Sequence, residues 1–197
     1  MSRRTRSWIV TSALVGLAAV AALSGCSSSD SGSAASSSTT SSSPPSGEVA
    51  GVVTYDGLSR RHVNHSVDYP QSPPVGGPHD PRWLTCTGTV YDTPVRNENA
   101  VHSMEHGAVW VTYSPTLPAA DVAVLAAAVR GTRYTMLSPY AGLDSPVVLT
   151  AWGRQLAVDS VDDPRVQEFI ATYANGPQTP EPGSPCRGGV RTSASSG

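Results

Sequence analysis

The sequence predicts an α+β domain with a small, mostly antiparallel sheet, two helices, a long loop rich in proline and glycine, and one disulfide. Short segments rich in β-branched and aromatic residues outnumber the two helical patterns. Five prolines and two glycines lie between positions 70 and 81, which leaves residues 60–82 without a convincing element. Once the terminal segments are set aside, roughly 140 residues remain, enough for one domain with one core.

The expected elements follow the order strand, strand, helix, strand, strand, strand, helix. The strongest strand is 108–113, which Ser114-Pro115 ends. A helix over 121–130 is rich in Ala and Val and has Gly131 as its cap. A last helix begins at Asp162 or Asp163, has Pro164 in its first turn and ends at Asn175-Gly176. The remaining expected strands are 87–91, 133–137, 147–152 and 156–158.

The N-terminus has the pattern of a secretory signal peptide over residues 1–25. Three arginines precede an apolar run over 8–23 that is too short to span a bilayer. The run ends in Leu23-Ser24-Gly25-Cys26, which resembles the bacterial lipobox, in which the cysteine is lipidated and becomes the new N-terminus. We therefore expect a lipid anchor at Cys26 and a position outside the cytoplasm, on the cell membrane. An ordinary cleaved signal followed by a stray cysteine is the alternative.

Three further segments complete the expected organisation. Residues 26–47 are almost wholly Ser, Thr, Gly, Ala and Pro, a composition typical of a disordered tether. Residues 48–190 form the single α+β domain, and 191–197 a disordered tail. Once Cys26 is assigned to lipid, Cys86 and Cys186 remain as a pair for one disulfide in an oxidising compartment. Free thiols that serve as metal ligands are the alternative for these two cysteines.

Charge excludes one class of partner. Thirteen basic and fifteen acidic residues give a formal net charge of −2, and no basic face or aromatic interleaving is evident. We therefore expect no nucleic-acid binding. An extracytoplasmic protein partner remains compatible with this surface.

Histidine is the most informative residue type in the chain. All five histidines fall between positions 62 and 106, and two of them belong to His102-Ser103-Met104-Glu105-His106. On a strand, side chains alternate, so His102, Met104 and His106 would share one face. We expect this segment at the mouth of the 108–113 strand. Two imidazoles and a thioether suit copper, the thioether favouring Cu(I), and the shell is completed by His79 and Met136, with His62 nearby.

Two other interpretations of this segment stay open. On a helix it would match the H-x-x-E-H zinc-hydrolase pattern, with Glu105 as the general base. The glycine and β-branched run that follow leave no helix to carry that pattern. Alternatively, the histidines hold the proline-rich loop through hydrogen bonds from both ring nitrogens, with Glu105 supporting one imidazole.

Five motifs occur in order at residues 67–71, 73–79, 101–107, 137–140 and 150–153. Together they resemble one bacterial, largely actinobacterial, family catalogued as "domain of unknown function 3105". The resemblance covers residues 50–188 and implies a small secreted or membrane-anchored domain, often a lipoprotein, without implying an activity. It also implies histidine at His62, His79, His102 and His106 and glutamate at Glu105. At Met104 the family commonly has leucine, which suggests packing there, and His65 has no counterpart.

The working hypothesis is an extracytoplasmic lipoprotein that binds a transition metal through His62, His79, His102 and His106. Copper is preferred over zinc because of Met104 and Met136. Binding or delivery of the ion is expected rather than catalysis. The alternatives are a non-catalytic interaction or scaffold lipoprotein, in which the histidines are structural, and a zinc-dependent hydrolase.

Overall fold

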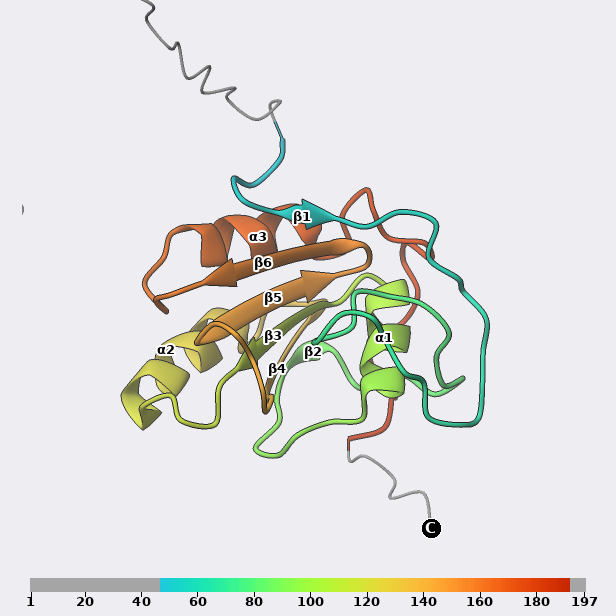
Figure 1. The fold of residues 1–197 in the computed structure, drawn as a ribbon, viewed down its shortest axis with the longest axis horizontal. Helices are drawn as coiled ribbons and strands as arrows, with labels where there is room; N and C mark the ends of the chain where they lie inside the picture. Colours follow the sequence, from blue (N-terminus) through green and yellow to red (C-terminus); the bar gives the residue numbers. More distant parts are fainter. Residues whose placement is uncertain (1–46, 192–197) are drawn as a thin grey trace, which may run out of the picture. The chain divides into compact units, whose positions relative to one another are not determined.

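A computed structural model describes residues 47–191 (Figure 1). The segments expected to be a signal peptide, the lipidated Cys26, the tether up to residue 46 and the tail from residue 192 lie outside the described residues. The elements, in chain order, are β1 Val53–Thr54, β2 Thr87–Val90, α1 Asn97–Glu105, β3 Val109–Tyr113, α2 Ala119–Val129, β4 Thr135–Pro139, β5 Val147–Ala151, β6 Arg154–Val158 and α3 Arg165–Tyr173.

The strands form one mixed sheet in the order β1-β6-β5-β3-β4-β2. Three neighbouring pairs, β1–β6, β5–β6 and β3–β5, are antiparallel, and β4 lies parallel to both β3 and β2. The α+β class and the mostly antiparallel sheet are thus confirmed, with a parallel part at one end. Within the described residues the helices number three, so the expectation of two was wrong.

The parallel part explains where the helices lie. The chain passes from β2 through α1 to β3, and from β3 through α2 to β4, which lies between the other two strands. The two crossovers therefore run in opposite directions across the sheet. Because such crossovers are almost always right-handed, their helices must cover opposite faces.

Side-chain packing confirms this three-layer arrangement. On one face, Val109 and Leu137 pack with Leu125 of α2 and Phe169 of α3 in an apolar cluster, which we call the α2–α3 core. On the other face, Trp110 packs in a second cluster with Met104 of α1, which we call the α1 core. Val109 and Trp110 are consecutive, so the alternation of a strand sends one side chain to each core.

The ends of α2 and α3 follow the sequence signals. Gly131, just after α2, has a φ of +78°, the left-handed conformation expected of a terminating glycine. Asp163 accepts the backbone N–H of Arg165 at 2.9 Å at the start of α3. Asn175, two residues beyond the end of α3, has a φ of +52°. The predicted boundaries of both helices are therefore confirmed to within about two residues.

The third helix, α1, is where the prediction was wrong. The sequence was expected to enter the 108–113 strand directly, but residues 97–105 are helical and Gly107, with a φ of +104°, ends the helix. Eight of the nine residues of α1 are buried, and many of them are polar. The apolar stripe of α1 is short, formed by Ala100, Val101 and Met104 among polar residues, and the helix therefore escaped sequence analysis.

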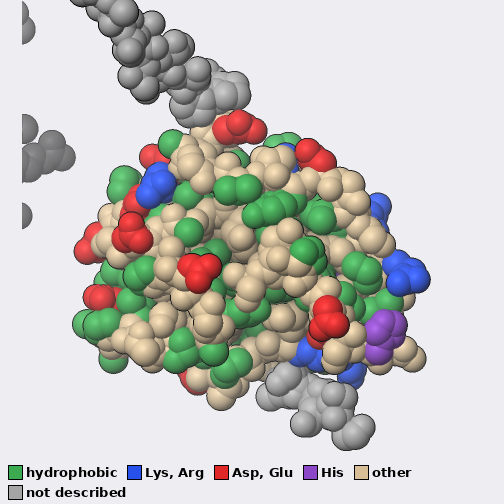
Figure 2. Space-filling view, in the orientation of Figure 1, with side chains coloured by type: hydrophobic (Ala, Val, Ile, Leu, Met, Phe, Trp, Pro, Cys, Tyr) green, Lys and Arg blue, Asp and Glu red, His purple; other side chains and the backbone are tan. Residues whose placement is uncertain are grey.

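Residues 55–85 pack over α1 largely as irregular chain. Its only bridges join His62 to His79 and, at its end, Leu84 to Val190. The expected disulfide is present, with Cys86 and Cys186 bonded. None of the described helices is long and apolar enough to cross a membrane. Acidic and basic side chains are scattered over the face seen in Figure 2, which shows no basic patch.

Candidate metal centre

Helix α1 presents two histidines and a glutamate to the loop that covers it. Positions 98, 102 and 105 or 106 lie on one face of a helix, because residues four apart are neighbours. Ala100, Val101 and Met104 point instead into the α1 core. His102 and Glu105 thus face the loop, and His106 caps the end of the helix beside them.

The loop supplies the other two histidines through a backbone bridge. The N–H of Val63 donates to the carbonyl of His79 at 2.7 Å, and the N–H of His79 donates to the carbonyl of Arg61 at 3.0 Å. This pairing places His62 next to His79, although 17 residues separate them along the chain. Their ring centroids are 4.9 Å apart, and that of His62 lies 4.9 Å from that of His102 as well.

Three of the imidazoles are oriented in the same way by backbone carbonyls. The Nδ1–H groups donate to the carbonyl of Gly77 from His79 at 2.8 Å, to that of Asp80 from His102 at 2.6 Å, and to that of Pro185 from His106 at 2.9 Å. These bonds assign the proton of a neutral ring to Nδ1 and leave Nε2 with its lone pair free. Metal-binding histidines are typically fixed in this way.

Two close contacts between acceptors follow from that orientation. Nε2 of His79 lies 2.9 Å from Oε2 of Glu105, and Nε2 of His102 lies 3.1 Å from Nε2 of His106. With each Nδ1–H given to a carbonyl, neutral rings would bring lone pair against lone pair at both places. Each contact therefore needs an extra positive charge, either a proton that makes an imidazolium or a metal ion that both atoms bind.

Glu105 is held as a carboxylate. Burial alone would raise its pKa, but hydrogen bonds from His79 and Arg60 outweigh burial and lower the pKa of Glu105 to about 2. Arg60 Nε donates to Oε1 of Glu105 at 2.7 Å, and Arg60 Nη2 donates to Glu181 at 2.9 Å. The Glu105 side chain is 3% exposed, so its charge depends on these partners.

His102 is held as a neutral imidazole. Burial, the largest cause, lowers its pKa, and its bond to the Asp80 carbonyl opposes that effect. With the neighbouring His106, His79 and His62, which also lower it, the pKa of His102 is about 4. A neutral imidazole with a fixed tautomer is the form that coordinates a metal. Trp83 lies against this ring and that of His106, with centroids 5.7 and 4.9 Å away.

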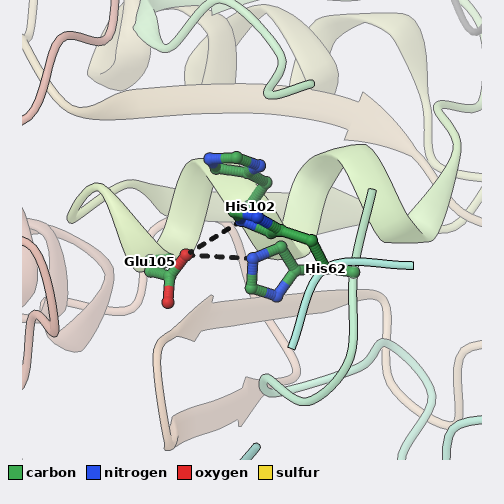
Figure 3. Close-up of side chains that lie close together, drawn as sticks. His62, His102 and Glu105 are labelled. Carbon is green, nitrogen blue, oxygen red and sulfur yellow. Dashed lines mark hydrogen bonds and ion pairs between the residues drawn. The ribbon is translucent and has the colours of Figure 1, made fainter. Parts of the chain in front are cut away.

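Four side chains offer ligand atoms close enough to share one ion. These are His62, His79, His102 and Glu105, which we call the four-donor group; one ligand atom from each lies within 4.8 Å of the others. Figure 3 shows Glu105 and His102 on α1 with His62 approaching from the loop. His79 is fully buried, whereas the His62 side chain is 51% exposed and forms the solvent side of the group.

The structure separates the predicted ligands. His62, His79 and His102 belong to the four-donor group, and Glu105, expected only as a supporting residue, has a carboxylate oxygen within the same distance. His106 lies at its edge, in contact with His102. Met104 and Met136 are fully buried in the α1 core, so they pack as apolar residues and the thioether argument for copper no longer applies. His65 is exposed and outside the group.

Because α1 is helical, His102, Glu105 and His106 have the arrangement that the H-x-x-E-H pattern requires. Glu105, however, is not suited to act as the general base. A general base works best with a pKa near the operating pH. The ion pair with Arg60 and the hydrogen bond with His79 hold the pKa of Glu105 far below that range, and both of its oxygens are engaged. Glu105 is therefore suited to binding a cation and not to activating a water molecule.

Sequence analysis missed the residues that orient the ligands. Arg60, Glu181 and Trp83 contact the group, and Pro185 contributes only a backbone carbonyl. Pro185 immediately precedes Cys186, so the expected disulfide was the one signal that this distant segment returns to the middle of the domain.

Comparison with curated proteins and with solved structures gave no match. A family model described as "Protein of unknown function (DUF3105)" matches residues 62–188, from His62 of the four-donor group to just beyond Cys186. The match covers roughly two thirds of the chain and all of the four-donor group. The chain therefore belongs to the DUF3105 family.

Proposed function

We propose that this domain binds one late first-row transition-metal ion, Zn(II) or Cu(II), at His62, His79, His102 and Glu105. The observation that carries the proposal is the common orientation of the inner imidazoles, whose Nδ1–H groups donate to backbone carbonyls. This leaves Nε2 of His79 against Oε2 of Glu105, and Nε2 of His102 against His106 at the edge of the four-donor group. Imidazole and carboxylate ligands suit both ions.

The charges of the group favour a cation. His102 is neutral, Glu105 is an anion, and the Nε2–Oε2 contact of His79 with Glu105 requires a positive charge between the two atoms or on the ring. A metal ion bound there supplies this positive charge without protonation of a buried ring. The exposed His62 gives an ion a path from solvent to the buried donors.

The proposed role is binding, delivery or sequestration at the outer side of the membrane, with Cys26 as the lipid anchor. The lipobox-like sequence and the Ser/Thr-rich segment after it support the anchor. A disulfide supports an oxidising compartment.

An interaction or scaffold role is the second candidate, because the contacts that would orient metal ligands would also stabilise the loop without a metal. Arg60 links Glu105 to Glu181, and the histidines tie the loop to α1. In that case the positive charge at the His79–Glu105 contact is a proton, and the four-donor group holds the loop against α1 without a metal ion.

Metal affinity and thermal stability separate the two roles. The purified full chain is titrated with Zn(II) and with Cu(II) in competition with a chromophoric chelator, and its unfolding temperature is recorded with and without each ion. We expect one equivalent to bind and to stabilise the fold by about 2.7 kcal/mol at a free-ion concentration 100 times Kd. The His79→Ala/His102→Ala variant should lose both effects.

The matched control is His65→Ala, which removes an exposed histidine of the same loop from outside the four-donor group. It should bind the ion as the unchanged chain does. If the unchanged chain gains no stability from either ion while the double variant unfolds at a lower temperature, the histidines are structural and the scaffold role stands.

A further inference from the structure

The segment after α3 covers the metal centre. Residues 175–191, which we call the strap, contain no helix or strand, and they run past α1 as the red segment of Figure 1. The N–H of Asn175 donates to the carbonyl of Gly107 at 2.8 Å, directly after α1. A side chain on Gly107 would meet Asn175, since a Cβ there would come within 2.9 Å of its Cα.

Three bonds of the strap reach the metal centre itself. The carbonyl of Pro185 accepts Nδ1–H of His106, which in turn contacts His102. The N–H of Glu181 donates to the backbone carbonyl of Glu105 at 3.1 Å. The carboxylate of Glu181 accepts a bond from Arg60, whose guanidinium also holds the Glu105 side chain. The strap thus acts on the orientation of ligands without supplying a member of the four-donor group.

The strap depends on one covalent link. Cys186 follows Pro185 and is bonded to Cys86, which is fully buried and immediately precedes β2. Hydrogen bonds reinforce this link: the N–H of Cys86 donates to the carbonyl of Cys186 at 2.9 Å, and the Tyr134 hydroxyl donates to the carbonyl of Ser184 at 3.1 Å. Without the disulfide, hydrogen bonds alone would hold Pro185 beside His106.

We propose that joining Cys86 to Cys186 switches the metal centre to its high-affinity form, so that ion capture is confined to the oxidised chain. This inference rests on the metal-binding function proposed above. In the switching step, the two protein thiols reduce an external disulfide: the Cys86–Cys186 bond forms, the external bond breaks, and two electrons and two protons pass to the external sulfurs. In the reduced chain hydrogen bonds alone hold the strap, so it fixes His106 and Arg60 less tightly.

Disulfide formation and ion binding must favour each other. If the disulfide tightens ion binding by a given factor, a bound ion must shift the thiol–disulfide equilibrium toward the disulfide by the same factor. Contacts that orient metal ligands are typically worth 10- to 100-fold in affinity, which sets the expected size of the coupling at about 10- to 100-fold.

The first test compares Zn(II) affinity in the oxidised full chain and in the Cys86→Ser/Cys186→Ser variant. Zinc is the probe because it is redox-silent, and serine removes thiols that would bind it. We expect a Kd about 10- to 100-fold weaker in the variant, with the fold checked by circular dichroism. Glu181→Ala keeps the disulfide and removes the carboxylate that accepts the bond from Arg60, and its Kd should lie between those of the two chains. Equal affinities in a folded variant would overturn the proposal.

The second test uses the unchanged chain, so it does not depend on the folding of the cysteine variant. The fraction of disulfide is measured in glutathione redox buffers with free Zn(II) fixed by a chelator buffer. Zinc should shift the equilibrium toward the disulfide, and His102→Ala should abolish the shift. No shift, or a shift toward thiols because they capture the ion, would overturn the switch. Failure of the chain to bind zinc at all would instead remove the metal function itself.

Discussion

The two faces of the sheet are held by different physics. The α2–α3 core consists of apolar side chains such as Phe169 and Leu125, whose burial removes hydrocarbon from water. The face covered by α1 joins a smaller apolar cluster to a layer of buried polar groups, among them His102, Ser103 and Glu105. Those polar groups are satisfied by the loop and the strap through hydrogen bonds and ion pairs.

The difference shows what each face is suited for. An apolar core stabilises in proportion to buried area and is indifferent to pH. A buried polar layer stabilises only while each donor and charge keeps its partner. Such a layer, however, can hold ionisable ligands in a fixed tautomer and charge state. The candidate metal centre lies in the polar layer, and substitutions on the two faces should therefore behave differently.

The largest effect is expected on the apolar face. Phe169→Ala should lower the free energy of unfolding by about 3–5 kcal/mol, because it leaves a cavity in the α2–α3 core. Denaturation in urea measures the loss, which should not vary between pH 5 and 7. The control, Val124→Ala on α2, changes a side chain 43% exposed and should cost less than about 0.5 kcal/mol. A loss of unfolding free energy that varied with pH in Phe169→Ala would contradict the predicted difference between the two faces.

A pH-dependent loss is expected on the polar face. The pKa of His102 is about 4 in the folded chain against a reference of 6.5, so between these values the unfolded chain takes up a proton that the folded chain does not. Stability should therefore fall as the pH drops from 6.5 to 4, by up to about 3 kcal/mol from this residue. In His102→Asn, whose amide keeps the donor to Asp80, that part of the fall should vanish. Urea denaturation in the presence of a chelator measures both chains, and parallel pH profiles would contradict the assignment.

The smallest effect is expected at Ser103, which joins α1 to the loop. Its hydroxyl accepts the N–H of Leu84 and lies 2.9 Å from the Leu84 carbonyl as well. Ser103→Ala leaves a buried backbone N–H without that partner and should cost about 1–2 kcal/mol at any pH between 5 and 7. Ser160→Ala, at an exposed turn, is the matched control and should change stability by less than about 0.5 kcal/mol. Equal costs at the two serines would show that the polar layer adds little.

The sequence by itself determined the elements whose signal is local. The strand before Ser114-Pro115, the helix ended by Gly131 and the helix that begins at Asp163 all follow from propensity and capping, which neighbouring residues decide. The disulfide between Cys86 and Cys186 followed from a count of cysteines. The clustering of histidines located the candidate centre, because an unusual density of imidazoles is visible without a structure.

Only the tertiary structure decided how that centre is built. Helix α1 has only a short apolar stripe, and the loop and the strap bury its polar face as well, which no local pattern shows. The helix also placed Glu105 beside the histidines and left Met104 in the core, since a helix and a strand send these side chains in different directions. The backbone carbonyls that fix the imidazoles come from Gly77, Asp80 and Pro185, and a carbonyl has no signature in sequence.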